Sequence, residues 1–146
     1  MQRILTVCTG NICRSPMAEF AMKAHFPDRQ IGSAGLHALV GRDMDDDSRA
    51  ATEQMGLATF PHAARQFDVD LSREHDLILV MEAHHRHEIA AKYPHAVGKT
   101  FLLGHFDNAR EVPDPYRSGL ALHLRAAELI LEHTAQWAAQ IRALER

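Results

Sequence analysis

The chain has 146 residues, of which 46% are hydrophobic and 24% charged, a composition typical of one soluble globular domain. We therefore predict a single domain over residues 1–146, long enough to bury a core without disulfides. A net charge of −3 without a basic run argues against nucleic-acid binding, and no apolar stretch approaches the ~20 residues of a membrane span. We expect no membrane insertion, and the N-terminal run is too short for a secretory signal.

The apolar pattern predicts short strands that alternate with helices. Strands are expected at residues 4–7, 31–35, 77–81 and 100–103. Helices are expected at 16–25, from a cap in the acidic run 45–48 to Gly56, at 83–93 and from about 119 to 144. The last helix would pack on the sheet with apolar residues spaced alternately by four and three: Leu120, Leu124, Ala127, Leu131, Thr134, Ala138 and Ile141. This alternation implies a parallel sheet covered on both faces, with the ligand at the carboxyl ends of the strands.

Residues 8–15, here called the cysteine loop, join the first predicted strand to the first predicted helix. We expect Ser15 to cap that helix and Pro16 to occupy its first turn. Backbone N–H groups in such a loop, together with the helix dipole, bind a tetrahedral oxyanion and favour the nucleophilic thiolate of Cys8. Arg14 could hold two phosphate oxygens bidentately, and Ser15 is close enough in sequence to donate a hydrogen bond to the sulfur. The pattern predicts phosphoryl transfer to sulfur.

The remaining residues of the loop suit a tight turn around an anion. Gly10 permits close approach of the backbone to phosphate, and Asn11 tolerates a left-handed conformation. Cys13 is the second of only two cysteines, so a structural disulfide framework is excluded and a reducing cytoplasm is the expected setting. Cys13 could trap oxidised Cys8 as a reversible disulfide or could be a small buried residue, and both interpretations stay open.

The string Cys-Thr-Gly-Asn-Ile-Cys-Arg-Ser-Pro at residues 8–16 resembles the phosphate loop of the low-molecular-weight protein tyrosine phosphatases. Asp114-Pro115-Tyr116 lies where that family carries its general acid, and residues 33–35, 62–66 and 76–82 resemble family segments in the same order. The resemblance spans nearly the whole chain and is closest to the Wzb-type enzymes of bacterial capsule and exopolysaccharide systems. It implies an α/β fold: a three-layer α/β/α sandwich with a four-stranded parallel sheet, flavodoxin-like in type.

The resemblance also implies how the site works. Cys8 would attack phosphorus to give a cysteinyl-phosphate intermediate, with Arg14 holding the phosphate. Asp114 would protonate the leaving phenolate and afterwards activate the water that hydrolyses the intermediate. The other phosphate-binding residues would be Thr9, Gly10, Asn11, Ile12, Cys13 and Ser15.

The walls and the support of the site are implied in the same way. Leu39 and Tyr116 would face the substrate ring, although both could be ordinary loop or core residues. His62 would help to hold the cysteine loop without taking part in proton transfer. Eukaryotic members carry a bulky aromatic near Ala38-Leu39 and commonly a second tyrosine where this chain has Arg117, so the preferred peptide sequence stays open.

Two other clusters have metal-like spacings, and neither predicts a metal site. The acidic run 43–47 begins like a calcium loop, but Ser48 and Gln54 stand where glycine and a bidentate glutamate are required. The histidines at 84, 85 and 87 with Glu88 lack an evident third ligand and are interpreted as a solvated helix face. Zinc on the two cysteines would need two more partners and would leave an arginine facing the metal. We therefore predict no metal and no cofactor.

The sequence predicts a cytoplasmic protein-tyrosine-phosphatase whose partner is a phosphotyrosine protein. By resemblance the substrate would be an autophosphorylated bacterial tyrosine kinase that controls polysaccharide export, and the enzyme a monomer or weak dimer. Thioredoxin-linked arsenate reductases need distant cysteines that this chain lacks, and arginine phosphatases carry threonine at the position of Ile12. A catalytically silent phosphotyrosine-binding module would need an unseen defect, because the four key residues are present: Cys8, Arg14, Ser15 and Asp114.

Overall fold

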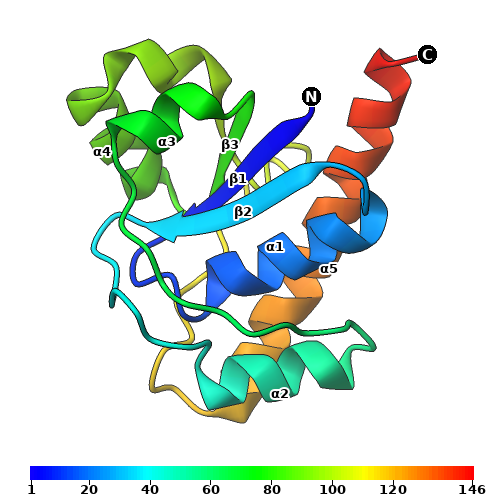
Figure 1. Ribbon diagram of the computed structural model, residues 1–146. Coiled ribbons are helices and arrows are strands. Elements are labelled where there is room, and N and C mark those ends of the chain that lie inside the picture. The colour runs from blue at the N-terminus through cyan, green and yellow to red at the C-terminus, as the bar shows by residue number, and fades with distance from the viewer.

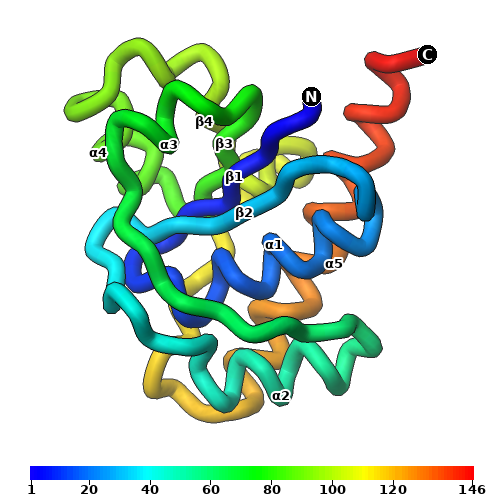
Figure 2. The backbone as a smooth tube through the Cα atoms, viewed as in Figure 1, coloured from blue at the N-terminus to red at the C-terminus, as the bar shows by residue number.

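Four parallel strands form the central sheet of the computed structural model, which describes residues 1–146. They are β1 (Arg3–Cys8), β2 (Gln30–Gly35), β3 (Leu77–Val80) and β4 (Thr100–Leu102), in the order β2-β1-β3-β4 (Figures 1 and 2). Ile4 of β1 pairs with Ile31 of β2 on one side and with Leu77 of β3 on the other. Because β1 lies inside the sheet, the cysteine loop that follows it emerges between neighbouring strand ends.

Helices cover both faces of the sheet (Figure 2). One face carries α1 (Arg14–His25) and α5 (Leu120–Leu144), with α2 (Asp46–Gln54) packed against both. The opposite face carries α3 (Val69–Glu74), α4 (Ala83–Lys92) and the 3₁₀ helix η1 (Pro94–Lys99). The predicted three-layer α/β/α sandwich with a four-stranded parallel sheet is therefore confirmed.

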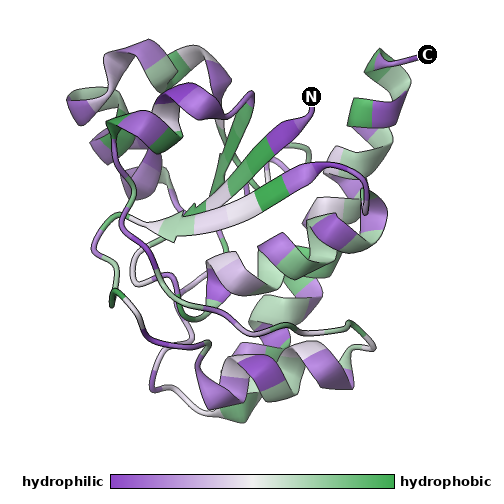
Figure 3. Ribbon diagram, viewed as in Figure 1, coloured by the Kyte–Doolittle hydropathy of each residue, from purple (hydrophilic) through white to green (hydrophobic).

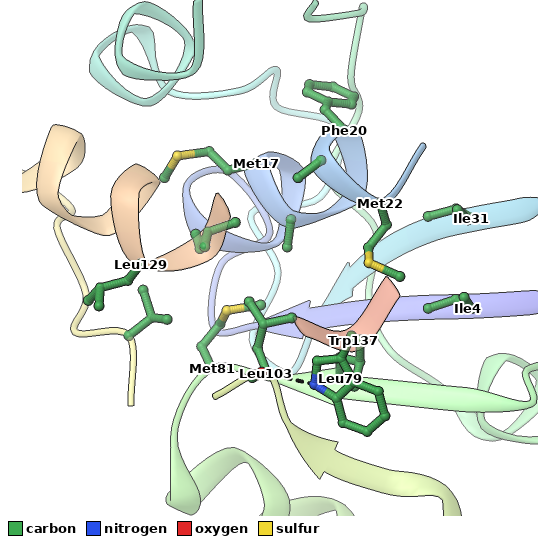
Figure 4. Close-up of a cluster of buried hydrophobic side chains, with 14 of the residues drawn as sticks. Ile4, Met17, Phe20, Met22, Ile31, Leu79, Met81, Leu103, Leu129 and Trp137 are labelled. Atoms are coloured by element: carbon green, nitrogen blue, oxygen red, sulfur yellow. Dashed lines mark hydrogen bonds between the residues drawn. The ribbon is translucent and has the colours of Figure 1, made fainter. Parts of the chain in front are cut away.

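Side chains on the two faces of the sheet belong to separate apolar clusters. Ile4 and Leu79 join α1 and α5 in the larger cluster (Figure 4), whereas Leu5 belongs to the cluster under α3 and α4. Trp137 of α5 completes the larger cluster and donates from Nε1 to the Leu103 carbonyl at 2.9 Å. Figure 3 accordingly shows mostly hydrophobic residues in β1 and β3, while the helices mix hydrophobic and hydrophilic positions.

Each predicted strand and helix is present, with its ends within two residues of the expected ones. The helices α3 and η1 have no counterpart in the prediction. Both contain six residues, which is too short for helical periodicity to show. The available signals were Asp68, which caps α3 by accepting from Leu71 N, and Pro94 at the start of η1.

Ser15 does not cap α1, so that prediction is wrong. The helix begins at Arg14, and its N-cap position is Cys13, whose side chain makes no capping hydrogen bond. Ser15 Oγ instead lies 2.9 Å from Cys8 Sγ and accepts from Asn11 Nδ2 at 2.8 Å. The hydroxyl is occupied within the cysteine loop and is therefore unavailable to the helix end.

The buried face of α5 is centred differently from the predicted stripe. Leu120 is 37% exposed, and Leu124 and Leu131 are only half-buried. The fully buried centre of the face includes His123, Ala126, Ile130, His133 and Trp137. The predicted stripe was misplaced because it was built from apolar residues alone, and two of the buried positions on α5 are histidines. None of the helices combines the length and the apolar character that a bilayer crossing requires.

Candidate active site

A pocket of about 190 Å³ opens at the carboxyl end of β1. The cysteine loop, the segment after β2 and residues 112–119, here called the aspartate loop, enclose it. The fold thus brings Asp114 to the same pocket as Cys8, although the two are far apart in sequence. The lining residues are Cys8, Thr9, Gly10, Ile12, Cys13, Arg14, His37, Leu39, Asp114 and Tyr116. His37 alone among them was not a predicted site residue.

Asn11 supports the backbone of the cysteine loop from behind the pocket. It is fully buried with φ of 58°, and its Nδ2 donates to Ser15 Oγ at 2.8 Å and to Ser33 Oγ at 2.9 Å. Its Oδ1 accepts from Arg65 N at 3.0 Å, and its carbonyl accepts from His62 Nε2 at 2.6 Å. The expected left-handed conformation is present, and His62 contacts the loop. The sequence indicated Ser33 and Arg65 only as members of segments that resemble the family, with no role of their own.

The Cys8 sulfur lies at the end of β1 and in front of the N-terminus of α1. Ser15 Oγ is 2.9 Å from it. This oxygen accepts from Asn11 Nδ2, and its one proton can be donated to the sulfur or to the more distant Ala34 carbonyl, which is 3.5 Å away. The dipole of α1 adds partial positive charge at the same place. Both features stabilise negative charge on the sulfur. Cys8 is buried, with 2% of its surface exposed.

Arg14 is buried, and only one of its guanidinium nitrogens is hydrogen-bonded to the rest of the protein. Its Nη1 donates to the Val112 carbonyl at 2.7 Å and to Glu82 Oε1 at 2.9 Å. Its Nη2 lies 3.8 Å from Asp114 Oδ2, and its buried Nε has no hydrogen-bond partner. The guanidinium therefore keeps donors for an oxyanion while Glu82 fixes its plane. Glu82 was missed, although it follows a predicted strand at the edge where the ligand was expected.

His85 contradicts the prediction of a solvated histidine face on α4. It is 1% exposed, and its Nδ1 accepts from the Glu82 backbone N–H at 3.1 Å. The ring proton therefore resides on Nε2, which donates to Thr9 Oγ1 at 2.9 Å. Burial, followed by the positive charge of Arg14, lowers the pKa of His85 to about 3. A neutral His85 thus ties α4 to the cysteine loop, whereas His84 is exposed as predicted.

The aspartate loop forms the outer side of the pocket. The Asp114 side chain is 49% exposed, and its Oδ1 accepts from Tyr116 N at 3.1 Å. The other oxygen, Oδ2, lies on the side of Arg14. Tyr116 and Leu39 both pack against the small cluster that contains Ile12. Both residues that were expected to face the substrate ring therefore line the pocket.

A buried thiol, a buried arginine and the start of a helix around one pocket define the class of cysteine-dependent phosphatases. The family model described as low molecular weight phosphotyrosine protein phosphatase matches residues 3–146. The chain belongs to this family.

Individual relatives agree with the family assignment. The low molecular weight protein-tyrosine-phosphatase Wzb of Salmonella typhimurium is 42% identical over 142 residues, which are 97% of this chain and 95% of that protein. The structure of the tyrosine phosphatase Wzb from Escherichia coli K30 in complex with sulphate has a TM-score of 0.93 at 38% identity, covering 96% and 98% of the two chains. The YwlE arginine phosphatase from Geobacillus stearothermophilus has a TM-score of 0.92 at 26% identity, covering 99% and 96%. The predicted resemblance to Wzb-type enzymes is confirmed, and the chain is a protein-tyrosine-phosphatase.

Proposed function

We propose that this phosphatase hydrolyses phosphotyrosine through a cysteinyl-phosphate intermediate on Cys8. The observation that carries the proposal is the presence of Cys8, Arg14 and Asp114 around one pocket. These groups supply a nucleophile, an anion holder and a proton donor.

In the first step the Cys8 thiolate attacks phosphorus, and the bond from phosphorus to the tyrosine oxygen breaks. A phenol has a pKa near ~10, so the departing phenolate benefits from a proton. Asp114 Oδ2, on the pocket side of a half-exposed carboxyl, would supply it. The Ser15 hydroxyl, 2.9 Å from Cys8 Sγ, would stabilise the thiolate before attack.

In the second step water attacks phosphorus, the sulfur–phosphorus bond breaks, and inorganic phosphate leaves. The Asp114 carboxylate would accept the proton of that water, which restores the acid for the next cycle. Cys8 departs as a thiolate, so the hydrogen bond from Ser15 Oγ favours this step as well.

Phosphate binding would fall to the cysteine loop and to Arg14. Arg14 Nε and Nη2 are placed to hold two oxygens, because Nη1 is engaged by Glu82 and Val112. Backbone N–H groups at the start of α1 would bind the remaining charge. The contributing positions would be Thr9, Gly10, Asn11, Ile12, Cys13 and Ser15.

The preference for a tyrosine ring would come from the apolar mouth of the pocket. Leu39, Tyr116 and Ile12 are contiguous there and present no charged group to the substrate side chain. A phosphoarginine side chain would bring a charged guanidinium against this apolar surface, where Ile12 offers no hydroxyl to bond with it. Ile12 therefore favours tyrosine over arginine.

We further propose, from the resemblance to Wzb-type enzymes, that the phosphotyrosine protein is an autophosphorylated bacterial tyrosine kinase of polysaccharide export. The expected setting is the reducing cytoplasm, where Cys8 stays a free thiol. On the same resemblance, we propose that the enzyme is a monomer or weak dimer.

The test is phosphate release from a tyrosine-phosphorylated peptide as a function of pH, with Cys8→Ser alongside. We expect a bell-shaped profile that disappears in the variant, because a thiolate and a protonated acid are both required. Phosphoarginine and arsenate are assayed in parallel under reducing conditions. Turnover of either in preference to phosphotyrosine would overturn the proposal, as would no turnover at all.

A further inference from the structure

We propose that Cys13, Asp45 and His123 form a binding site for one thiophilic divalent cation, such as Zn²⁺, behind the cysteine loop. The proposal does not depend on the catalytic chemistry proposed above, although Cys13 belongs to the cysteine loop and also lines the catalytic pocket. No metal was expected from the sequence, because the three residues come from distant segments that only the fold brings together.

The three ligand atoms lie close enough together to share one metal ion. His123 Nε2 lies 3.3 Å from Asp45 Oδ2 and 3.9 Å from Cys13 Sγ, and all three atoms lie within 4.8 Å of one another. Bonds of about 2.3 Å to sulfur and about 2.0 Å to nitrogen or oxygen place tetrahedral ligands roughly 3.3–3.6 Å apart. The separation of His123 and Asp45 already fits, whereas Cys13 Sγ would have to approach His123 Nε2 by a few tenths of an ångström, and water would be the fourth ligand.

The hydrogen bond on the far side of the His123 ring prepares it for a cation. Its Nδ1 lies 2.7 Å from the Gly119 carbonyl, which can only accept, so Nδ1 carries the proton. In the neutral ring the lone pair of Nε2 then faces the Asp45 carboxylate, which is also an acceptor. Two facing acceptors require either a proton or a metal cation between them, and the nearby Cys13 sulfur is the reason we propose the metal. A backbone carbonyl that orients the ring in this way is typical of metal-binding histidines.

The surroundings of the Cys13 sulfur determine how cation binding would depend on pH. Ser48 Oγ is fully buried beside the Cys13 thiol and has no hydrogen-bond partner at bonding distance. Burial raises the pKa of Cys13 to about 12, which the nearby Asp45 charge reinforces and the Ser48 hydroxyl partly offsets. A divalent cation would displace the thiol proton, so binding would release a proton and would weaken as the pH falls.

The location explains what the cation would do. Cys13 precedes α1, Asp45 precedes α2 and His123 lies in the first turn of α5, and neither Cys13 nor Asp45 uses its side chain to cap its helix. A cation would join three helix starts and fix the cysteine loop at Cys13. Asp45 is 24% exposed at its side chain, which gives the ion a route from solvent.

A second cluster of possible ligands, Glu82 with His84 and His85, does not compete. The two ring nitrogens of His85 are already engaged by the Glu82 backbone N–H and by Thr9. No lone pair is left for a metal there. His84 therefore offers a matched control. It is a histidine beside a carboxylate, but no third ligand is available next to it.

The experiment uses the full chain with Cys8→Ser as the background, so that the catalytic sulfur cannot bind the probe. Co²⁺ is titrated to look for thiolate-to-metal charge-transfer absorption, and Zn²⁺ affinity is measured by calorimetry. We expect one equivalent with the sulfur band, and a lower affinity at lower pH. Adding His123→Phe should reduce the affinity by more than the ~10–100-fold that loss of an outer partner costs. Adding His84→Ala should leave it unchanged.

Asp45→Asn provides a second variant that does not depend on refilling the core, because Asp45 is partly exposed and its side chain does not cap α2. It should also weaken Zn²⁺ binding and remove the rise in melting temperature that Zn²⁺ causes. Absence of the sulfur band, or equal affinity with and without His123→Phe, would overturn the proposal. Titration of His123 as an imidazolium paired with Asp45, with no response to Zn²⁺, would overturn it as well.

Discussion

The cysteine loop and the aspartate loop line the same pocket but are built in opposite ways. In the cysteine loop Asn11, Arg14 and Ser15 are at most 1% exposed. Asn11 bonds to Ser15 within the loop and to Ser33 outside it, and Arg14 bonds to Val112 and Glu82. In the aspartate loop the Asp114 side chain is half exposed, accepts one hydrogen bond from Tyr116 N in its own turn, and lies 3.8 Å from Arg14 Nη2. The cysteine loop is thus buried and preorganised, whereas the carboxylate of the aspartate loop is open to solvent. The difference teaches that anion binding relies on rigidity here, whereas proton transfer relies on access.

The largest effect is expected where the rigid side holds the reacting atoms. Cys8→Ser should abolish turnover of aryl phosphates, because an alcohol at this position is a poor nucleophile. Arg14→Lys should lower kcat/KM by about 10²–10³-fold, since lysine cannot reproduce bidentate binding or the bond to Glu82. Steady-state kinetics on a phosphotyrosine peptide checks both. Retention of more than a tenth of the activity in Arg14→Lys would show that Arg14 does not hold the phosphate.

The next-largest loss of activity is expected from a change in the aspartate loop, and its size should depend on the leaving group. Asp114→Asn should lower kcat by about 10²–10⁴-fold for a phenolate of ordinary basicity, because the acid is lost. With an aryl phosphate whose phenol is strongly acidic, the first step should be nearly normal. A Brønsted plot of single-turnover rates against leaving-group pKa measures this. Equal slopes for the wild type and Asp114→Asn would exclude Asp114 as the acid.

Ser15→Ala tests whether the rigid side also acts on the sulfur. A hydrogen bond to a charged group contributes about 1.5–3 kcal/mol, so kcat should fall by roughly 10–100-fold with little change in KM. Ser33→Ala is the matched control, since Ser33 also accepts from Asn11 but makes no hydrogen bond to the sulfur. If the two variants lose equal activity, the effect of Ser15 arises from support of the loop alone.

The last effect is on stability and not on turnover, and it concerns His85, which joins the cysteine loop to α4. The folded protein keeps this ring neutral because its pKa is lowered to about 3, whereas the unfolded chain protonates near 6.5. Between these values the unfolded state binds more protons, so stability falls as the pH falls, by up to about 1.4 kcal/mol per pH unit. Denaturant unfolding from roughly pH 7 to pH 4 should show a shallower acid limb in His85→Gln. Parallel limbs would mean that His85 does not bury a neutral ring.

The two regions also differ in how far they could be predicted from the sequence. The cysteine loop is contiguous, so the spacing of Cys8, Arg14 and Ser15 already indicates a thiol in an anion site. Asp114 could be placed only through the family resemblance, because an aspartate between prolines is common in turns. The spacing of residues in the sequence predicts a site when one loop holds all its functional groups. It does not predict a site whose groups come together only through the fold.

Side chains that meet across the fold account for the remaining misses. Glu82 and His85 surround Arg14 only because β3 lies beside β1 and α4 starts where β3 ends. His123 resides on a helix that was predicted, yet its burial depends on how that helix is rotated. Small rotations are set by packing volumes in the core, which a one-dimensional pattern does not contain.

The most direct test of the account is to trap the phosphoryl group on the enzyme. Asp114→Asn is mixed with an aryl phosphate of a strongly acidic phenol, quenched rapidly and analysed by peptide mass spectrometry. Because the variant can complete the first step but lacks the base for the second, we predict one phosphoryl group per chain on the peptide that contains Cys8. A stoichiometric burst of phenol without a phosphorylated Cys8 peptide, or phosphorylation of another residue, would contradict the account.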